Sequence, residues 1–140
     1  MSAGSGVVHS ESNRERAATR LFQIWIHPRT RGGLPGWGAK SFPKGARSGR
    51  FVILASGIEG DVDALSIRAD ARVLGANLKA GETAEYRLGA DQHAYLVPAT
   101  GSVEVNGVRI DARDGAAIAK ETVLQVTAVA DAEIVMVDAF

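Results

Sequence analysis

The dipeptide Asn106-Gly107 separates two short runs of alternating apolar and polar residues. Both central residues of a type I′ turn need a positive φ, which Gly adopts freely and Asn tolerates, so the pair predicts a two-residue β-hairpin. The turn fixes three cross-strand pairs: Val105 with Val108, Glu104 with Arg109 and Val103 with Ile110. We expect the four β-branched side chains to form a buried inner face. Their burial contributes roughly 1.5–3 kcal/mol each, whereas a solvated charge pair contributes about 0.2–1 kcal/mol.

Strand-like runs continue on both sides of this hairpin, and turn signals recur about every 8–12 residues. No segment shows a helical period, so we predict an all-β fold, an antiparallel sandwich or barrel. Turns are expected at residues 99–101 and 130–132, among others. The predicted strands are Phe51–Ala55, Leu65–Arg68, Arg72–Leu78, Ala84–Leu88, Ala94–Pro98, Ser102–Asn106, Val108–Asp111, Ala116–Ala119, Val123–Ala128 and Ile134–Asp138.

The first 50 residues follow a different pattern. Residues 1–20 are rich in Ser, Gly, Arg and Ala and predict a loosely ordered arm. Leu21–Ile26 is typical of a strand that ends before Pro28. Residues 27–50 contain three prolines and six glycines without a helix or strand period, so they predict a connector. The expected organisation is an arm with one strand at 1–26, a connector at 27–50 and a barrel at 51–140. The aromatic residues expected to pack the connector against the barrel are Phe22, Trp25, Trp37 and Phe42.

Length and composition limit the kinds of functional site that the chain can contain. A chain of 140 residues can bury the core of one domain. It has no cysteine, which excludes disulfides, thiolate metal sites and cysteine nucleophiles. Neither a signal peptide nor an apolar run long enough for a membrane span is present, so we expect a soluble cytoplasmic protein without membrane contacts.

Charge is balanced overall but unevenly distributed. Residues 27–50 carry six Lys or Arg and no acidic residue, whereas residues 51–140 carry an excess of acid. One interpretation is that the basic connector lies across the acidic body of its own chain or of a second copy. The other is a patch for nucleic acid or another anion. Only Trp37 and Phe42 offer aromatic stacking within the connector, and no nucleic-acid motif is present, so nucleic acid is not the expected partner.

Four phrases occur in a characteristic order: LFQIWI (21–26), DALSIRADARVLGANLKAGETAEYRL (63–88), HAYLVPATGSVEVNGVRIDARDGAAI (93–118) and AEIVMVDAF (132–140). This order resembles the carboxy-terminal half of the pirin family, two-barrel members of the cupin superfamily. The resemblance implies a cupin-type jelly-roll barrel, a double-stranded β-helix, for residues 51–140. The opening MSAGSGVVHSESN resembles the last motif of the family's amino-terminal barrel. The expectation is therefore a chain that holds only the end of that barrel.

The resemblance also implies a place for metal. Pirins and related quercetin dioxygenases hold one metal in the amino-terminal barrel, through a His-x-His and a later His-x-Glu pair; here His9 and Glu11 match the later pair. Residues two apart on a strand face the same side, and this nitrogen–oxygen donor set suits Fe(II), Ni, Mn or Cu. Two ligands are too few for a stable site. The remaining histidines, His27 and His93, match no ligand pattern, and we expect structural or surface roles for them.

Other catalytic patterns are weak. The acidic pairs Asp61/Asp63 and Asp111/Asp114 fall at predicted turns, where carboxylates cap the backbone. The glycines at 32–33 and 36–38 do not join a strand to a helix, so they do not predict a phosphate-binding loop. No serine lies in a nucleophile-elbow motif.

Three functional hypotheses remain. The first, which we favour for this chain, is a non-catalytic cupin module that binds a second copy or a partner barrel through residues 1–50, with no resident cofactor. The second is a metal-dependent dioxygenase of a flavonol such as quercetin, with Glu11 as ligand and base, which requires upstream or partner residues to complete the site. The third is a regulatory protein that binds a partner through its basic connector, as the resemblance to pirins of higher organisms implies.

Overall fold

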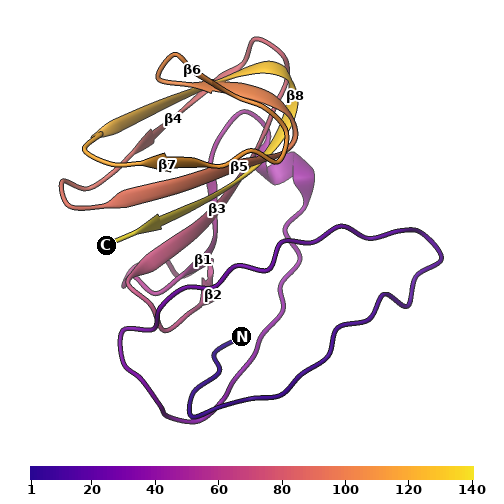
Figure 1. Cartoon of the computed structure of the whole chain (residues 1–140), viewed down its shortest axis with the longest axis vertical. Helices are drawn as coiled ribbons and strands as arrows, with labels where there is room; N and C mark the ends of the chain where they lie inside the picture. The colour runs from indigo at the N-terminus through magenta and orange to yellow at the C-terminus, as the bar shows by residue number, and fades with distance from the viewer.

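The computed structural model describes residues 1–140 and consists of a β-barrel preceded by a long extended arm (Figure 1). One short 3₁₀ helix, η1, spans Lys44–Arg47. The strands are β1 (Val52–Ser56), β2 (Leu65–Ser66), β3 (Ala71–Leu78), β4 (Thr83–Arg87), β5 (His93–Val105), β6 (Val108–Ile110), β7 (Ala116–Ile118) and β8 (Val123–Ala139). The predicted all-β class is confirmed. No helix has the length and apolar character needed to cross a bilayer.

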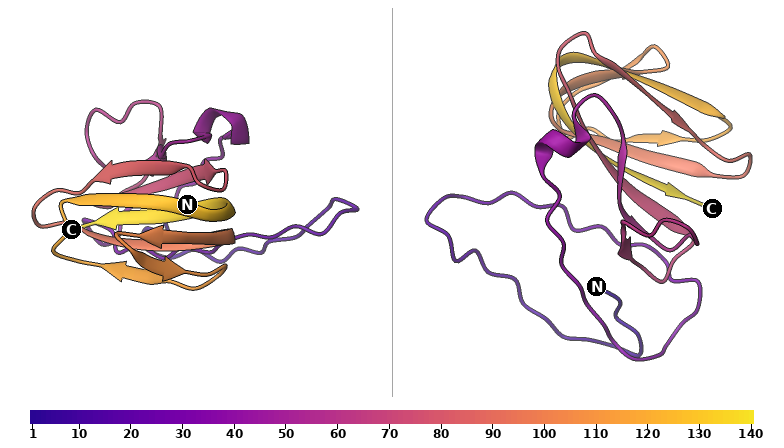
Figure 2. Two further views of the ribbon diagram at one scale, coloured as in Figure 1. Left: turned by 90° about the horizontal axis from the view of Figure 1, so that it is seen from above. Right: turned by 180° about the vertical axis from the view of Figure 1, so that it is seen from behind.

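Strand β8 organises the sheet. The hydrogen-bonded order is β2-β1-β3-β8-β5-β6, with β4 also paired to β8 and β7 to β5. The carboxy-terminal half of β8 pairs with β3 and the amino-terminal half with β4, while β5 follows β8 along most of its length. Because β5 and β8 are long and bent, the single sheet folds over as two facing layers (Figures 1 and 2).

The core lies between these layers. It is formed by alternate residues of the long strands, as the two-residue period of a strand requires. Its largest fully buried apolar side chains are Leu74, Leu96, Leu124, Ile134, Met136, Val103 and Val126. Phe51 and Tyr86 pack against this cluster in an edge-to-face arrangement, with ring centroids 5.8 Å apart.

The central hairpin has the predicted register, Val105 with Val108 and Val103 with Ile110. Asn106 and Gly107 both have positive φ, as the turn requires. Its inner face is smaller than predicted, because Val103 and Val105 are buried but Val108 is 62% exposed. Strand β6 is only three residues long, pairs with β5 alone and lies at the edge of the sheet.

Two predicted turns are wrong. Residues 99–101 lie within β5 and residues 130–132 within β8, so each pair of predicted strands is one continuous strand. The register between β5 and β8 shifts at Pro98, Thr100 and Ser102. Gly101 has φ +73°, and a Cβ atom there would lie 2.2 Å from the carbonyl oxygen of Asp131. These turn-like residues therefore bend two strands at a bulge, and this bend lets each strand contribute to both layers.

The predicted strand at Leu21–Ile26 is also wrong. The segment is extended but pairs with no strand, and residues 1–43 hold only one isolated β-bridge, between Ser2 and Gly36. Trp25 and Trp37 are 87% and 83% exposed, so they do not pack the connector against the barrel as predicted. A strand requires a neighbour for its backbone N–H and C=O groups. The arm projects away from the barrel and has none (Figure 2).

Candidate functional site

The predicted metal-binding pair lies on the arm. The Nε2 atom of His9 is 3.9 Å from Oε1 of Glu11, and the two side chains are 37% and 57% exposed. An imidazole nitrogen and a carboxylate oxygen on one side of an extended segment fit the donors of a divalent transition metal. No group of three or more His, Asp or Glu side chains comes together anywhere in the chain. His27 and His93 are exposed and lie outside this pair, which therefore supplies two donors alone.

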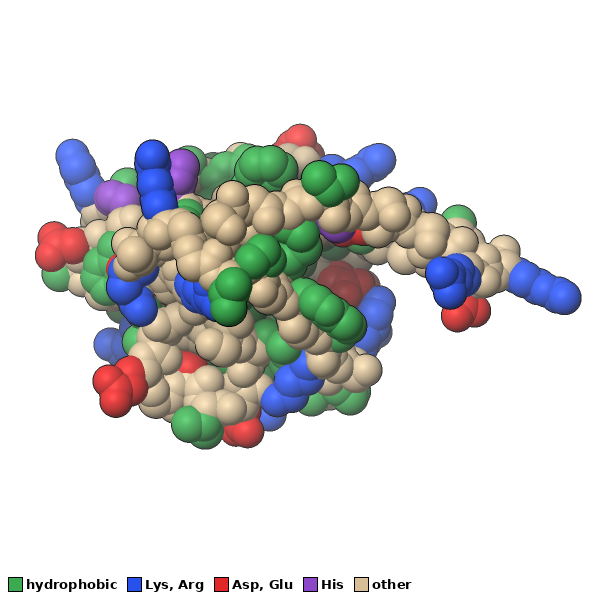
Figure 3. All heavy atoms as spheres, turned by 90° about the horizontal axis from the view of Figure 1, so that it is seen from below, with side chains coloured by type: hydrophobic (Ala, Val, Ile, Leu, Met, Phe, Trp, Pro, Cys, Tyr) green, Lys and Arg blue, Asp and Glu red, His purple; other side chains and the backbone are tan.

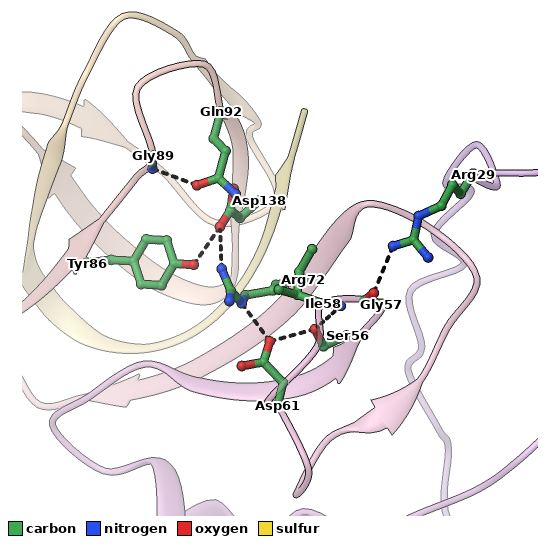
Figure 4. A network of polar contacts seen from close by, with 10 residues as sticks. All are labelled: Arg29, Ser56, Gly57, Ile58, Asp61, Arg72, Tyr86, Gly89, Gln92 and Asp138. Carbon is green, nitrogen blue, oxygen red and sulfur yellow. Dashed lines mark hydrogen bonds and ion pairs between the residues drawn. The ribbon is translucent and has the colours of Figure 1, made fainter.

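A second polar cluster, which the sequence analysis missed, lies at one end of the barrel (Figure 4). Its innermost member is Asp138, whose exposed area is 0%. The Tyr86 hydroxyl donates a hydrogen bond of 2.6 Å to Oδ2 of Asp138, and Nη1 of Arg72 lies 3.8 Å from the same oxygen. Oδ1 of Asp138 is buried without any hydrogen-bond partner.

Arg72 connects Asp138 to the loop after β1. Its Nε donates to Oδ2 of Asp61 at 2.7 Å, and the Ser56 hydroxyl donates to the same oxygen at 2.6 Å. The Ser56 oxygen in turn accepts a 2.9 Å hydrogen bond from the backbone N–H of Ile58. A chain of polar contacts thus runs from the barrel interior to its rim, and we call Tyr86, Asp138, Arg72, Asp61 and Ser56 the polar relay.

The two carboxyl groups of the polar relay respond in opposite ways. Burial raises the pKa of Asp138, because removal from water disfavours the charged form more than Tyr86 and Arg72 favour it. The hydrogen bonds from Arg72 and then Ser56 lower the pKa of Asp61. Burial, followed by the hydrogen bond to Asp138, raises the pKa of the Tyr86 hydroxyl. Asp61 is therefore the anionic end of the relay, and Asp138 is the carboxyl most readily protonated.

Local sequence explains this placement. Ile134, Met136 and Asp138 occupy alternate positions of β8 and are all 0% exposed, so Asp138 continues the inward-facing row. It pairs with Arg72 on β3 and with Ala94 on β5. The sequence does contain a signal for Asp138, because an acidic residue stands where the alternation of the strand places an apolar, inward-facing one. Its partners could not be found the same way, because Tyr86 and Arg72 lie 52 and 66 residues earlier in the chain.

Most connector cations are engaged within their own chain. Arg29 pairs with Asp70 and donates to the carbonyl oxygen of Gly57 at 2.9 Å. Lys44 and Arg47 both pair with Glu133, at 2.8 and 3.1 Å. Two further connector cations donate to backbone carbonyls, Lys40 to that of Asp63 and Arg50 to that of Ala46. The pairs of Arg29 with Asp70 and of Lys44 and Arg47 with Glu133 support the interpretation in which the basic connector lies against the acidic body of its own chain.

Comparison with known proteins gives consistent results. Residues 53–139 match the family described as the quercetinase C-terminal cupin domain. A pirin-like protein of Caulobacter vibrioides is 65% identical over 139 residues, which are 99% of this chain and 60% of that protein. A Pseudomonas aeruginosa protein, whose name proposes a quercetin 2,3-dioxygenase, is 60% identical with the same coverage. The chain therefore spans about 60% of the length of these relatives.

The fold has a close counterpart among solved structures. The bacterial pirin YhhW from Escherichia coli, solved in complex with nickel(II), superposes with a TM-score of 0.72 at 23% identity. The match covers 80% of this chain and 47% of that one. At this identity the likeness concerns the fold, and it confirms the cupin-type barrel predicted for the carboxy-terminal part of the chain.

Proposed function

The chain belongs to the pirin family and carries its quercetinase-type C-terminal cupin domain, and from this premise we propose that it acts as a non-catalytic binding module. In this proposal the barrel is a scaffold, and residues 1–50 associate with a second copy of the chain or with a partner cupin barrel. The observation that carries the proposal is the extended arm with its exposed apolar side chains.

The arm exposes large apolar groups that a folded protein ordinarily covers. Figure 3 shows hydrophobic side chains exposed over the face that carries the arm, with Lys and Arg side chains at its far tip. The large apolar residues exposed within residues 1–50 are Met1, Val7, Val8, Leu21, Phe22, Ile24, Trp25, Leu34 and Trp37. Exposed large apolar side chains gathered in one segment favour an interaction site. Trp is also among the residues most enriched at the centres of interfaces.

The donor set supports the non-catalytic part of the proposal. His9 and Glu11 are two ligands, and a redox-capable mononuclear site normally takes three or four protein ligands oriented by further hydrogen bonds. Neither side chain of the pair accepts or donates a hydrogen bond that would fix its orientation. The pair therefore contributes to a metal site only when other donors approach it.

The first test combines elemental analysis of the purified chain with sedimentation. The proposal predicts less than stoichiometric transition metal in the wild type, the same content in His9→Ala, and a dimer or higher assembly. A stoichiometric metal that disappears in His9→Ala would overturn the non-catalytic assignment. A strictly monomeric chain would overturn the association through residues 1–50.

A second candidate function is a flavonol dioxygenase assembled with further donors. The observation in its favour is the 3.9 Å approach of His9 Nε2 and Glu11 Oε1, together with relatives named for quercetin 2,3-dioxygenase activity. Together with the further donors, His9 and Glu11 would hold Fe, Ni, Mn or Cu, a metal that would supply Lewis-acid and redox chemistry toward a flavonol and O₂, and Glu11 would accept the substrate proton. Quercetin consumption that depends on added metal and on His9 would establish this function.

The regulatory hypothesis receives less support. It depends on uncompensated basic groups in the connector, and three of the six connector cations are paired with acidic residues of their own chain. Retention of a nucleic-acid or protein partner at low salt, lost at high salt, would be the result that restores it.

A further inference from the structure

A surface hollow of about 760 Å³ lies between the arm at residues 29–33 and the loop at residues 56–61. Four of its sixteen lining residues are hydrophobic, and the others are polar, charged or glycine. It includes Ser56 and Asp61, the outer end of the polar relay, but neither His9 nor Glu11. The hollow is therefore separate from the candidate metal ligands, and it needs no second copy of the chain.

Three arginines line the hollow, and two of them keep an uncompensated charge. Arg29 is paired with Asp70. Nη1 of Arg68 donates to the carbonyl oxygen of Leu34 at 2.8 Å, a bond that orients the guanidinium without neutralising it. Arg31 makes no ion pair or hydrogen bond within the protein.

The acidic residues of the lining do not cancel these charges. Asp61 is already bound by Arg72 and Ser56. Glu59 is the remaining acid, and it is exposed on the loop without a partner. The free charges of the lining are thus two guanidinium groups against one carboxylate, and the hollow favours an anion.

Backbone donors add to the guanidinium groups. The N–H groups of residues 30–33 and of Glu59 and Gly60 donate to no acceptor within the protein. Gly32, Gly33 and Gly60 have φ of +79°, +82° and +94°. The space where a Cβ atom would stand is open at Gly32 and Gly60, and at Gly33 the Nη1 atom of Arg68 lies 3.3 Å from it. Glycine turns of this kind let a ligand approach the backbone closely, and their N–H groups form concave sites for anions.

We propose that this hollow binds the oxyanion group of a small carboxylate- or phosphate-bearing molecule. Arg31 and Arg68 bind its oxygens through paired N–H donors, since the planar guanidinium matches both carboxylate and phosphate geometry. The amides of the two glycine turns complete the contacts. The contact of Arg68 with Leu34 fixes one guanidinium in advance, which lowers the entropy lost on binding.

The test is a titration of the ¹⁵N-labelled chain, followed by the amide resonances of Gly32, Gly33, Gly57 and Gly60. Sodium succinate and inorganic phosphate are the probes, each at constant ionic strength, with sodium chloride as the reference. The proposal predicts saturable shifts of these glycine resonances at dissociation constants on the order of millimolar. A response to succinate alone assigns the site to carboxylates, and a response to phosphate alone assigns it to phosphoryl groups.

The matched variants are Arg31→Ala and Arg87→Ala. Arg31 makes no hydrogen bond or ion pair within the protein, so its removal is expected to leave the fold intact, and binding is expected to weaken about tenfold through the loss of one charge-assisted contact. Arg87 lies on β4 and pairs only with Glu85, so its removal leaves the affinity unchanged. Glycine resonances that do not move with either probe would overturn the proposal, as would equal affinities for Arg31→Ala and the wild type.

Discussion

At the scale of single residues, the polar relay shows how neighbouring environments give two aspartates opposite properties. Asp138 lies in the apolar row of β8 with one oxygen unpartnered, whereas Asp61 lies at the rim and receives two strong hydrogen bonds. Desolvation dominates in the first case and charge-assisted hydrogen bonding in the second. The free energy of unfolding should therefore depend on pH through both groups, in separate ranges.

In the wild type, the free energy of unfolding should fall as pH rises because Asp138 ionises. Asp138→Asn should abolish this fall. The pKa of Asp138 is higher in the folded than in the unfolded chain, so its ionisation lowers the free energy of unfolding as pH rises from the unfolded value through the folded one. Urea denaturation from about pH 4 to pH 7 measures this slope. The wild type should show it, and Asp138→Asn should be flatter over that range. Equal slopes would contradict the raised pKa.

Asp61→Asn should lower the free energy of unfolding at neutral pH and have little effect at acidic pH. Because the pKa of Asp61 is lowered by folding, its contribution is fully present above the unfolded value and is lost as pH falls through the folded one. We expect the variant to lose roughly 1–3 kcal/mol at neutral pH and little below the folded pKa. Asp63→Asn is the control, since its exposed side chain makes no hydrogen bond or ion pair. A similar loss in both variants at neutral pH would argue against the relay.

At the scale of elements, β5 and β8 form the barrel because both bend at the same place. Gly101 in β5 approaches the backbone of Asp131 in β8 more closely than any residue with a Cβ atom permits. The register shifts between the two strands fall around this contact. The bend carries each strand from one layer to the other, so a single close approach supports the closure of the sheet.

Gly101→Ala should therefore be far more destabilising than Gly107→Ala. Both glycines have positive φ, which costs about 1–2 kcal/mol for alanine. Only Gly101 also faces a backbone atom, so its substitution should cost roughly 1–3 kcal/mol more. Urea midpoints of the two variants give the comparison. Equal losses would mean that the strands separate easily at the bend.

One attachment of the connector to the barrel is through η1. Lys44 and Arg47 share Glu133, and the side-chain amide of Asn77 donates to the carbonyl oxygen of Lys44 at 2.8 Å. The Arg47 side chain crosses over Gly75, and its Nε is buried without an acceptor. Glu133 is thus the only group that compensates the charge of Arg47.

Glu133→Gln should loosen this attachment and leave the barrel folded. We expect trypsin to cleave after Lys44 and Arg47 roughly threefold faster or more, because local opening limits cleavage of a docked segment. Glu85→Gln is the control, since Glu85 pairs only with Arg87 on its own strand. Unchanged cleavage in Glu133→Gln would show that backbone contacts alone hold η1.

At the scale of the whole molecule, the barrel is well packed and the arm is not. Residues 1–43 form no strand ladder, and their large side chains are mostly exposed (Figures 1 and 3). The barrel by contrast buries one continuous apolar cluster. This contrast is the physical basis for the proposed association through the arm. Association would remove the exposed apolar side chains from water, which is favourable.

The double variant Trp25→Ser, Trp37→Ser should weaken association without unfolding the barrel. Both indoles are exposed, so the free energy of unfolding should change little, while sedimentation equilibrium should show a shift toward monomer. Tyr95→Ser, an exposed aromatic on β5, is the control for a general decrease in hydrophobicity. An unchanged assembly in the double variant would locate the interface elsewhere.

The sequence alone determined what depends on neighbours in the chain. Asn106-Gly107 set the hairpin register, because the φ angles of a turn are local, and the two-residue alternation correctly placed Val103 and Val105 in the core. The order of the family phrases identified the pirin-type barrel, and the opening MSAGSGVVHSESN pointed to the His9–Glu11 pair. Residues 53–139 and the fold match confirm the first of these. The metal role of the pair stays a prediction.

Only the tertiary structure decided what depends on contacts between distant residues. Glycine and acidic residues at 99–101 and 130–132 have the local chemistry of turns, but strand pairing across the bend makes them bulges instead. The apolar run Leu21–Ile26 has the composition of a strand and no partner to complete it. The polar relay and the arginine-lined hollow arise from side chains far apart in sequence, and their charge and pKa depend on burial, which local patterns do not specify.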